Sequence, residues 1–332
     1  MNPTARAVIG ATGLEVSRLG LGTAPLGGLY EAVDESGAMA VVEAAWSAGI
    51  RFFDTAPLYG YGLSERRLGA ALRDKPRGEY VLATKVGRLL RAGGATDASQ
   101  LQDGEPFYKG TPPLNPVFDF TYEGVMRSVE ESLERLGLDR VDILHIHDPD
   151  DNYEAALEGA YRALARLRSE GTIGAIGAGM NQAQMLARFA RAADFDCFLI
   201  AGRYTLLDQS ALEDLLPLCA DSNISVIAGG VFNSGILAEP GPGARFDYVP
   251  ATAECVERAV RIQTVCELHD VPLKAAAIQF PLGHPAVTSV VVGCRSVSEL
   301  LEDVEMIKVA IPSAVWLDLK ADQLLPVETP TP

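Results

Sequence analysis

Short apolar segments alternate with longer amphipathic segments along most of the 332-residue chain. The apolar segments are continuous rather than interleaved with polar residues, which is typical of parallel strands buried on both faces. Eight of them are predicted to be strands, at 17–23, 51–53, 80–84, 141–146, 173–176, 197–200, 224–227 and 288–292. Eight amphipathic segments that follow them are predicted to be helices, at 35–48, 64–73, 121–136, 151–169, 182–192, 210–221, 253–269 and 297–308.

The number of these β–α units constrains the fold. Eight units in a chain of this length favour a closed barrel over an open, doubly wound sheet, so the predicted fold class is α/β, a (β/α)8 TIM barrel. Residues 1–332 are predicted to form one domain, with an extended or frayed tail at about 325–332. Residues 6–17 predict an N-terminal β-hairpin, and residues 88–120 a loop after strand 3 that far exceeds the usual connection length. In such a barrel, residues that follow the strands meet at one mouth.

Composition and charge narrow the possible partners. A hydrophobic fraction of 48% supports a large core, and no apolar run approaches the ~18 residues that a membrane span requires. The start of the chain lacks a hydrophobic signal core, so a soluble, cytoplasmic protein without a membrane partner is expected. A net charge of −16 predicts a surface that repels nucleic acid phosphates. The five cysteines form no C-x-x-C pair, which argues against a disulfide framework or a thiolate metal site.

Four polar residues stand at or just beyond the ends of predicted strands. Asp54 follows strand 2, Lys85 follows strand 3 and His147 follows strand 4, while Tyr59 lies in the loop after Asp54. A buried carboxylate needs a cation, so Asp54 and Lys85 are expected to pair inside the mouth. An ammonium close to Tyr59 is expected to lower the pKa of the phenol toward working pH. Tyr59 is therefore the expected general acid and base, with His147 holding the same substrate oxygen.

The segment HIHDPD at 145–150 also fits other roles. His145 lies deeper on the same side of its strand as His147, where a hydrogen-bonded packing histidine is expected. Histidines two apart with flanking carboxylates also occur in metal-dependent barrel hydrolases. No second histidine cluster accompanies them, since His269 and His284 fall in helical or loop segments, and no metal is expected.

Longer motifs surround these four residues. The chain resembles the aldo-keto reductase superfamily in its start, GLEVSRLGLGTAPLG, in the spacing of Asp54, Tyr59, Lys85 and His147, and in GCRSVSELLEDV near its end. Within that superfamily, RSVEESLERLGLDRVDILHIHDPD and AGGVFNSGIL are most similar to bacterial dehydrogenases of L-fucose, L-galactose or D-threo-aldoses and to pyridoxal 4-dehydrogenase. The resemblance implies one aldo-keto reductase barrel in which the four residues form the catalytic tetrad.

The resemblance also implies a nicotinamide cofactor, NAD or NADP, bound extended across the barrel mouth. In oxidation, Tyr59 as tyrosinate would take the proton of the C1 hydroxyl of a cyclic sugar while C1 gives hydride to the cofactor, and a lactone would form. In reduction, the same phenol would protonate the carbonyl oxygen of an aldehyde or sugar. Besides Asp54, the residues implied to bind the cofactor are Gly22, Thr23, Asn181, Phe232, Ser234, Gly235, Gly293, Arg295, Glu299 and Asp303.

Five positions depart from the superfamily's usual residues. Gly179-Met180 replaces a Ser-Asn pair, Ala201 replaces a glutamine, and Gly229 replaces a tyrosine that often stacks on the nicotinamide. Glu299 stands where NADPH-specific members tend to place an arginine. A carboxylate there repels a 2′-phosphate and accepts a hydrogen bond from a ribose hydroxyl, which favours NAD, whereas Arg295 keeps NADP use open.

Several alternatives stay open at this level. Pyridoxal 4-dehydrogenase would use the same tetrad but needs ring-stacking residues in the long loop, and a general aldehyde or ketone reductase is also compatible. A non-enzymatic, cofactor-sensing regulatory subunit would keep the same barrel. Tyr61, Phe107, Tyr108 and Phe118 either line the substrate site or anchor their loops. Cys294 is either a packed or a reactive thiol, and the sequence does not define the oligomeric state.

Overall fold

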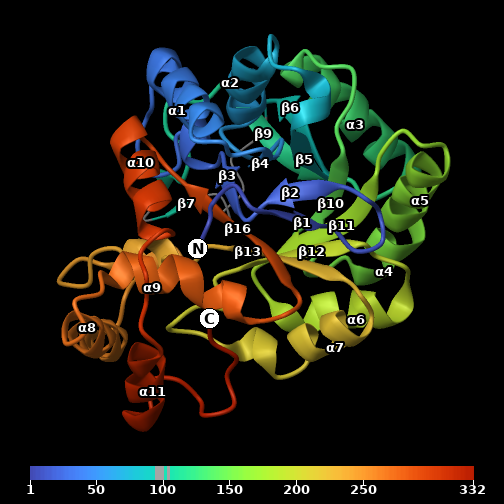
Figure 1. Ribbon diagram of the computed structural model, residues 1–332. Helices are drawn as coiled ribbons and strands as arrows, with labels where there is room; N and C mark the ends of the chain where they lie inside the picture. Colours follow the sequence, from blue (N-terminus) through green and yellow to red (C-terminus); the bar gives the residue numbers. More distant parts are fainter. Residues whose placement is uncertain (94–100, 103–104) are drawn as a thin grey trace.

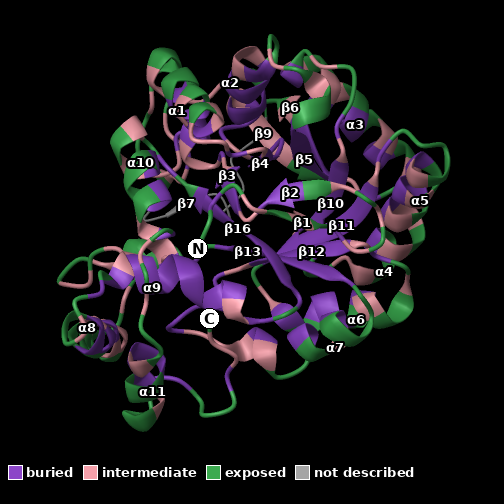
Figure 2. Ribbon diagram, viewed as in Figure 1, coloured by how far each residue is buried: buried purple, intermediate pink, exposed green. Residues whose placement is uncertain are grey.

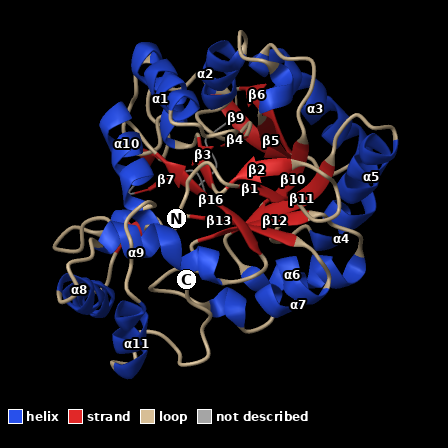
Figure 3. Ribbon diagram, viewed as in Figure 1, coloured by secondary structure: helices blue, strands red, loops and turns tan. Residues whose placement is uncertain are grey.

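Eight parallel strands close into a barrel in the computed structural model, which describes residues 1–93, 101–102 and 105–332 (Figure 1, Figure 3). The barrel strands are β3 (Leu19–Gly22), β4 (Phe52–Asp54), β5 (Val81–Val86), β10 (Ile143–His147), β11 (Ala175–Met180), β12 (Cys197–Ala201), β13 (Ser225–Gly229) and β16 (Val287–Gly293). They follow one another around the ring in chain order, and β16 closes it by pairing with β3. Each overlaps a predicted strand segment, which confirms the (β/α)8 TIM barrel.

Helices surround this barrel (Figure 1). They are α1 (Glu35–Ser47), α2 (Leu63–Leu72), α3 (Tyr122–Leu136), α4 (Tyr153–Ala155), α5 (Arg162–Ser169), α6 (Ala183–Ala192), α7 (Leu215–Asp221), α8 (Ala253–Glu267), α9 (Leu273–Gln279), α10 (Val297–Met306) and α11 (Ser313–Ala321). A π-helical turn at Ala156–Tyr161 joins α4 to α5, so the helix predicted at 151–169 is interrupted. The sequence pattern does not predict α9 or α11. Six of the seven residues of α9 are buried, so this helix has almost no polar face that would reveal its period.

Side chains fill the barrel interior, and they alternate along each strand with side chains that point outward. The interior layer includes Phe52, Ala83, Ile143, Leu199 and Ile227. Outward-facing residues of the same strands belong to the large core beneath the helices. Figure 2 shows the barrel strands as the buried centre of the molecule. The interior is therefore a packed core, and ligands have access only at its ends.

The remaining strands form short antiparallel pairs outside the barrel. The pairs are β1 (Arg6–Val8) with β2 (Glu15–Ser17), β6 (Arg88–Ala92) with β9 (Leu114–Phe118), β7 (Leu101–Gln102) with β8 (Glu105–Pro106), and β14 (Arg245–Phe246) with β15 (Val249–Pro250). The first pair confirms the predicted hairpin. Val16 of β2 and Ile9, which follows β1, join the interior layer, so the hairpin covers the N-terminal end of the barrel and leaves the C-terminal mouth for ligands.

The long connection after β5 reaches the connection after β3. The amide of Tyr30 donates to the carbonyl of Phe107 at 2.9 Å, and Leu29 forms a β-bridge with Tyr108. The prediction of a long loop over residues 88–120 is thus replaced in part by short strands, while 94–100 and 103–104 lie outside the described residues. Phe107 and Tyr108 of this connection are therefore held beside the loop that follows β3.

The end of the chain packs against the barrel. Leu325 is 2% exposed and Thr329 is 1% exposed. The hydroxyl of Tyr204 donates to the carbonyl of Pro330 at 3.4 Å. Within the tail predicted at about 325–332, Leu325 and Thr329 are therefore packed and a hydrogen-bonded turn joins Pro326 to Thr329, whereas Val327 is 76% exposed.

Candidate active site

Asp54 and Lys85 form an ion pair inside the barrel mouth. Asp54 ends β4 and Lys85 lies near the end of β5, and both side chains face the interior. Lys85 Nζ lies 2.7 Å from Asp54 Oδ2 and donates to the carbonyl of Thr55 at 2.9 Å. Lys85 is 1% exposed and Asp54 is 2% exposed. Burial raises the pKa of Asp54, and the charge of Lys85 acts in the opposite direction.

Tyr59 lies directly above this pair. Lys85 Nζ is 4.7 Å from the centre of the Tyr59 ring. The loop that carries the ring is packed tightly against the connection after β3. A Cβ at Gly27 would lie 2.6 Å from the carbonyl carbon of Tyr59, and one at Gly60, where φ is +62°, would collide with Gly27 O. Glycines on both sides of the contact therefore fix where the tyrosine stands.

The pKa of Tyr59 moves in the opposite direction from that expected from the sequence. Burial raises it well above its ordinary value, and the charge of Asp54 raises it further. The prediction of a lowered pKa is wrong because burial of the phenol dominates, and the charge of Asp54 acts in the same direction as burial. Tyr59 therefore carries its proton at neutral pH and is poised as a donor in the free protein.

His147 faces Tyr59 from the end of β10. The two ring centres are 5.8 Å apart in an edge-to-face arrangement. Burial, followed by the charges of Arg88 and Lys85, holds the pKa of His147 well below its ordinary value, so the imidazole is neutral. Its Nδ1 is buried with no partner among the described residues. A neutral imidazole beside a phenol provides a second hydrogen-bonding group for one substrate oxygen.

His145 lies deeper in the barrel, as predicted, but the protein does not satisfy its ring. It is 0% exposed, and neither ring nitrogen has a partner among the described residues. Burial and the charge of Lys85 lower its pKa to about 3. A Cβ at Gly177 would collide with the imidazole, so this glycine makes room for it. The expectation of a hydrogen-bonded packing histidine is wrong in that respect, although the residue is packed and neutral.

Most residues expected to bind the cofactor stand around the same mouth. Gly22 pairs with Gly293 where β3 and β16 end. Phe232, Ser234 and Gly235 follow β13, with φ of +58° at Ser234 and +102° at Gly235. Consecutive residues in this conformation turn backbone amides toward one point, which suits a phosphate group. Asn181 is exposed just after β11.

The side chains of Thr23 and Asp303 are buried and bonded within the protein rather than exposed at the mouth. The Thr23 hydroxyl donates to the carbonyl of Asp54 at 3.0 Å and accepts from Ser64 Oγ at 2.7 Å, and the residue is 0% exposed. Asp303 is 5% exposed and accepts from the thiol of Cys294 at 3.4 Å. Burial raises the pKa of Asp303 to about 7. Both expected contacts therefore serve internal hydrogen bonds, and Cys294 is a buried packing residue.

Arg295 is already engaged by two carboxylates. Arg295 Nη2 lies 2.7 Å from Glu299 Oε1, and Arg295 Nη1 lies 3.3 Å from Glu31 Oε2. The backbone amide of Arg295 also donates to Glu299 at 2.7 Å. These contacts lower the pKa of Glu299, which stays ionised. The Arg295 side chain is half exposed, so a 2′-phosphate that contacts it competes with both carboxylates.

Gly179 and Gly229, two of the positions that depart from the superfamily's usual residues, are not crowded by their neighbours. A Cβ at Gly179 would have its nearest neighbour, Lys85 Cε, at 3.4 Å, and a Cβ at Gly229 would have Leu199 Cδ2 at 3.4 Å. Both distances are ordinary contacts, so a Cβ at either position meets no close neighbour. The uncrowded glycines at 179 and 229 and the left-handed loop at 232–235 therefore fit a nicotinamide cofactor.

Aromatic side chains wall the mouth on the side of Tyr59. The Tyr108 ring centre lies 6.4 Å from that of Tyr59 and 6.0 Å from that of Tyr61. Phe107 contacts Tyr248 of the β14–β15 turn, with ring centres 6.3 Å apart. The long loop therefore brings Phe107 and Tyr108 to the site. Phe118 instead packs on Phe120 and anchors its own strand.

Arg88 and Asp148 stand beside the tetrad, and the sequence pattern does not reveal them. Arg88 Nη2 lies 3.0 Å from Asp148 Oδ2, and His147 Nε2 lies 3.5 Å from the same oxygen. Asp148 follows His147 in the chain, where strand alternation would point it away. Its φ of +41° ends the strand and allows its carboxylate to turn back toward His147. In the sequence, the pair is indicated only by the presence of Asp148 in the polar segment that follows His147.

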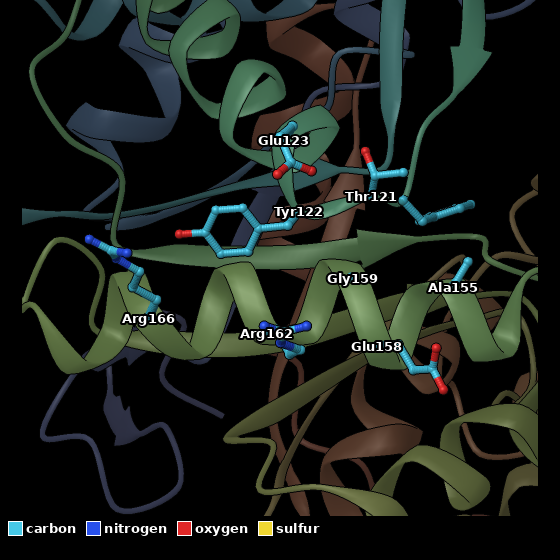
Figure 4. A pocket seen from close by; sticks show the side chains of 9 residues that line it. Thr121, Tyr122, Glu123, Ala155, Glu158, Gly159, Arg162 and Arg166 are labelled. Atoms are coloured by element: carbon cyan, nitrogen blue, oxygen red, sulfur yellow. The ribbon is translucent and has the colours of Figure 1, made fainter.

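A separate cavity of about 680 Å³ lies between the start of α3 and the outer face of the α4–α5 helix. Figure 4 shows Arg162 and Arg166 along this helix, with Tyr122 opposite them. Arg166 is paired with Glu170 at 2.8 Å. This cavity is on the outside of the barrel, whereas the tetrad is at the mouth.

Two further features of the described residues bear on the expectations from sequence. No group of three or more His, Cys, Asp or Glu side chains that could hold a metal ion occurs among them. Within the same ranges, no helix combines the length and the apolar character that crossing a membrane requires.

A barrel whose mouth brings together a tyrosine, a buried lysine–aspartate pair and a histidine is typical of a class of nicotinamide-dependent oxidoreductases. The chain belongs to the aldo/keto reductase family, whose model matches residues 18–321. It is an oxidoreductase, and members of this family use NAD(P)H and act on small aldehydes or sugars.

Named relatives and a solved structure agree with this assignment. The chain is 46% identical to D-threo-aldose 1-dehydrogenase of a Pseudomonas species, over 95% of this chain and 97% of that protein. It is 43% identical to pyridoxal 4-dehydrogenase of Microbacterium luteolum, over 96% of this chain and 97% of that protein. The fold matches the holo form of an aldo-keto reductase from Bacillus halodurans with a TM-score of 0.77 at 23% identity, over 98% of both chains.

Proposed function

We propose that this protein is an NAD-dependent dehydrogenase that oxidises C1 of L-fucose, L-galactose or D-threo-aldose-type sugars to the lactone. The observation that carries the proposal is the Asp54–Lys85 pair beneath the ring of Tyr59, with His147 at the edge of the same ring. Tyr59 and His147 can both reach one substrate oxygen. Asp54 and Lys85 set the electrostatics of the phenol that moves the proton.

The proposed chemistry divides into a hydride and a proton. A bound nicotinamide would supply the hydride acceptor, its C4, for the hydrogen on C1 of the sugar. Ionised Tyr59 takes the proton of the C1 hydroxyl, so the C1–O bond becomes a carbonyl as the C1–H bond breaks. Neutral His147 holds that oxygen and keeps it beside the phenol. In the reverse direction, the protonated phenol that burial favours gives its proton to a carbonyl oxygen.

The residues proposed to hold the cofactor are those that the geometry leaves accessible to it. Gly22 and Asn181 are proposed to border the nicotinamide half, and the loop at 232–235 to offer amides to the pyrophosphate. Gly293, Arg295 and Glu299 are proposed to border the adenosine half. Because Arg295 is held by Glu299 and Glu31, a 2′-phosphate gains little from it, and this supports NAD over NADP.

The proposed substrate follows from the side chains that border the barrel mouth. Arg88 and Asp148 place charged hydrogen-bonding groups beside His147, which suits a polyhydroxylated substrate. The relative named as an aldose dehydrogenase is also slightly more similar than the one named as a pyridoxal dehydrogenase, at 46% against 43% identity. Pyridoxal is the second candidate, because Tyr108 lies where an aromatic substrate could stack.

A substrate panel tests the proposal. The purified protein is incubated with NAD or NADP and with L-fucose, L-galactose, D-arabinose or pyridoxal, and the absorbance of reduced nicotinamide is followed. Fast NAD-dependent oxidation of at least one sugar is expected. Turnover of pyridoxal with none of the sugars would select the second candidate and reject the first.

A further inference from the structure

A charged pair at the rim of the mouth has no role in the proposed proton transfer. Arg88 is the first residue of β6 and is 7% exposed, while the side chain of Asp148 is 28% exposed. The guanidinium lies over the ring of Phe118 at 4.5 Å and donates to Asp148 Oδ2 at 3.0 Å. The other carboxylate oxygen, Oδ1, accepts no hydrogen bond from the described residues.

The backbone fixes both members of the pair. Gly87 precedes Arg88 with φ of +99°, and a Cβ there would collide with the ring of Phe120, so Arg88 begins its strand at a set position. The amide of Asp148 donates to the carbonyl of Gly179 at 3.1 Å, which ties its left-handed turn to β11. A non-glycine residue in this conformation carries a local free-energy cost that the surrounding contacts must offset. The pair is therefore preorganised rather than a chance surface contact.

The pair faces the reacting centre. Asp148 Oδ2 is 3.5 Å from His147 Nε2, and the charge of Asp148 contributes to raising the pKa of Tyr59, Tyr108 and Tyr248. The charge of Arg88 in turn lowers the pKa of His147. Arg88 and Asp148 thus lie among the side chains that line the substrate side of the mouth.

We propose that Arg88 and Asp148 together bind a hydroxyl group on the carbon next to the reacting carbon of the substrate, and so determine specificity for polyhydroxylated aldehydes and aldoses. A hydroxyl both donates and accepts, which matches a carboxylate oxygen beside a guanidinium. A substrate without that hydroxyl leaves both charged groups without a partner from the ligand, which disfavours it. This inference rests on the proposed oxidoreductase function of the same mouth.

The test compares two aldehydes of equal chain length. Reduction of glyceraldehyde, which carries a hydroxyl beside the carbonyl, and of propionaldehyde, which does not, is measured with NADH. Asp148→Asn removes the charge and keeps the size, and Arg88→Lys keeps the charge and removes the planar fork. Asp151→Asn is the matched control, because Asp151 is an exposed carboxylate in the same loop.

We expect kcat/KM for glyceraldehyde to fall about 10- to 100-fold in Asp148→Asn, mostly through KM, with a change below about threefold for propionaldehyde. Arg88→Lys should act in the same direction, and Asp151→Asn should change neither substrate. Equal losses for the two aldehydes would mean that Asp148 only supports His147, and would overturn the proposal. A wild-type protein that prefers glyceraldehyde but oxidises no sugar would contradict the proposed substrate and leave the role of the pair supported.

Discussion

Lys85 Nζ lies 2.7 Å from Asp54 Oδ2 and 4.7 Å from the centre of the Tyr59 ring. The Lys85 ammonium therefore neutralises the buried carboxylate of Asp54 and also lies against the face of the Tyr59 ring. Because both charges are nearly inaccessible to water, changing either one alters the stability of the mouth as well as its chemistry.

Removing the lysine alone should destabilise the fold. Lys85→Met leaves Asp54 buried without a cation, and we expect a loss of about 3–5 kcal/mol in the free energy of unfolding. The double variant Lys85→Met, Asp54→Asn should regain most of that loss, because no uncompensated charge remains. Denaturant unfolding followed by circular dichroism measures both. A single variant as stable as the wild type would show that the pair is not buried in solution.

The two reaction directions should depend on pH in opposite ways. Burial and Asp54 raise the pKa of Tyr59, so the phenol is protonated at neutral pH and its ionised form grows as pH rises. We therefore expect the rate of sugar oxidation to rise with pH from neutral toward alkaline conditions, approaching tenfold per unit. Carbonyl reduction should stay level over the same range. An oxidation rate that is flat between neutral and alkaline pH would contradict the raised pKa.

Cofactor preference should respond to the charge at Glu299. Glu299→Arg removes one of the carboxylates that hold Arg295 and adds a cation for a 2′-phosphate. The ratio of kcat/KM with NADP to that with NAD should rise at least about tenfold, the factor that corresponds to 1.4 kcal/mol. Glu305→Arg makes the same charge change on the same helix and serves as the control. An unchanged ratio in Glu299→Arg would remove Glu299 from the adenosine end.

The barrel could be predicted because its strands are continuous apolar runs separated by amphipathic helices. The pattern fails for α9, whose residues are buried nearly all round, since a helix without a polar face shows no period. It also does not predict that Leu325 and Thr329 are buried, because two positions in a proline-rich segment form no periodic pattern.

The tetrad could be predicted from its place at strand ends, but side-chain direction could not. Thr23 stands at the right strand end, yet its hydroxyl turns inward to Asp54. The position of the Asp148 side chain could not be predicted for the opposite reason. Strand alternation predicts that it points away from the mouth, but its left-handed backbone turns it toward His147. The pKa of Tyr59 depends first on the burial of its phenol and then on the distance to Asp54, and a sequence contains neither.

The central claim is that Tyr59 moves the proton, and Tyr59→Phe tests it most directly. The variant keeps the ring above Lys85 and removes only the hydroxyl. NAD affinity is measured by fluorescence titration, and oxidation of the best sugar by reduced-nicotinamide absorbance. We expect kcat to fall at least about 10³-fold, while the Kd for NAD changes less than about threefold. Substantial residual turnover with unchanged NAD binding would contradict the assignment of Tyr59 as the acid and base.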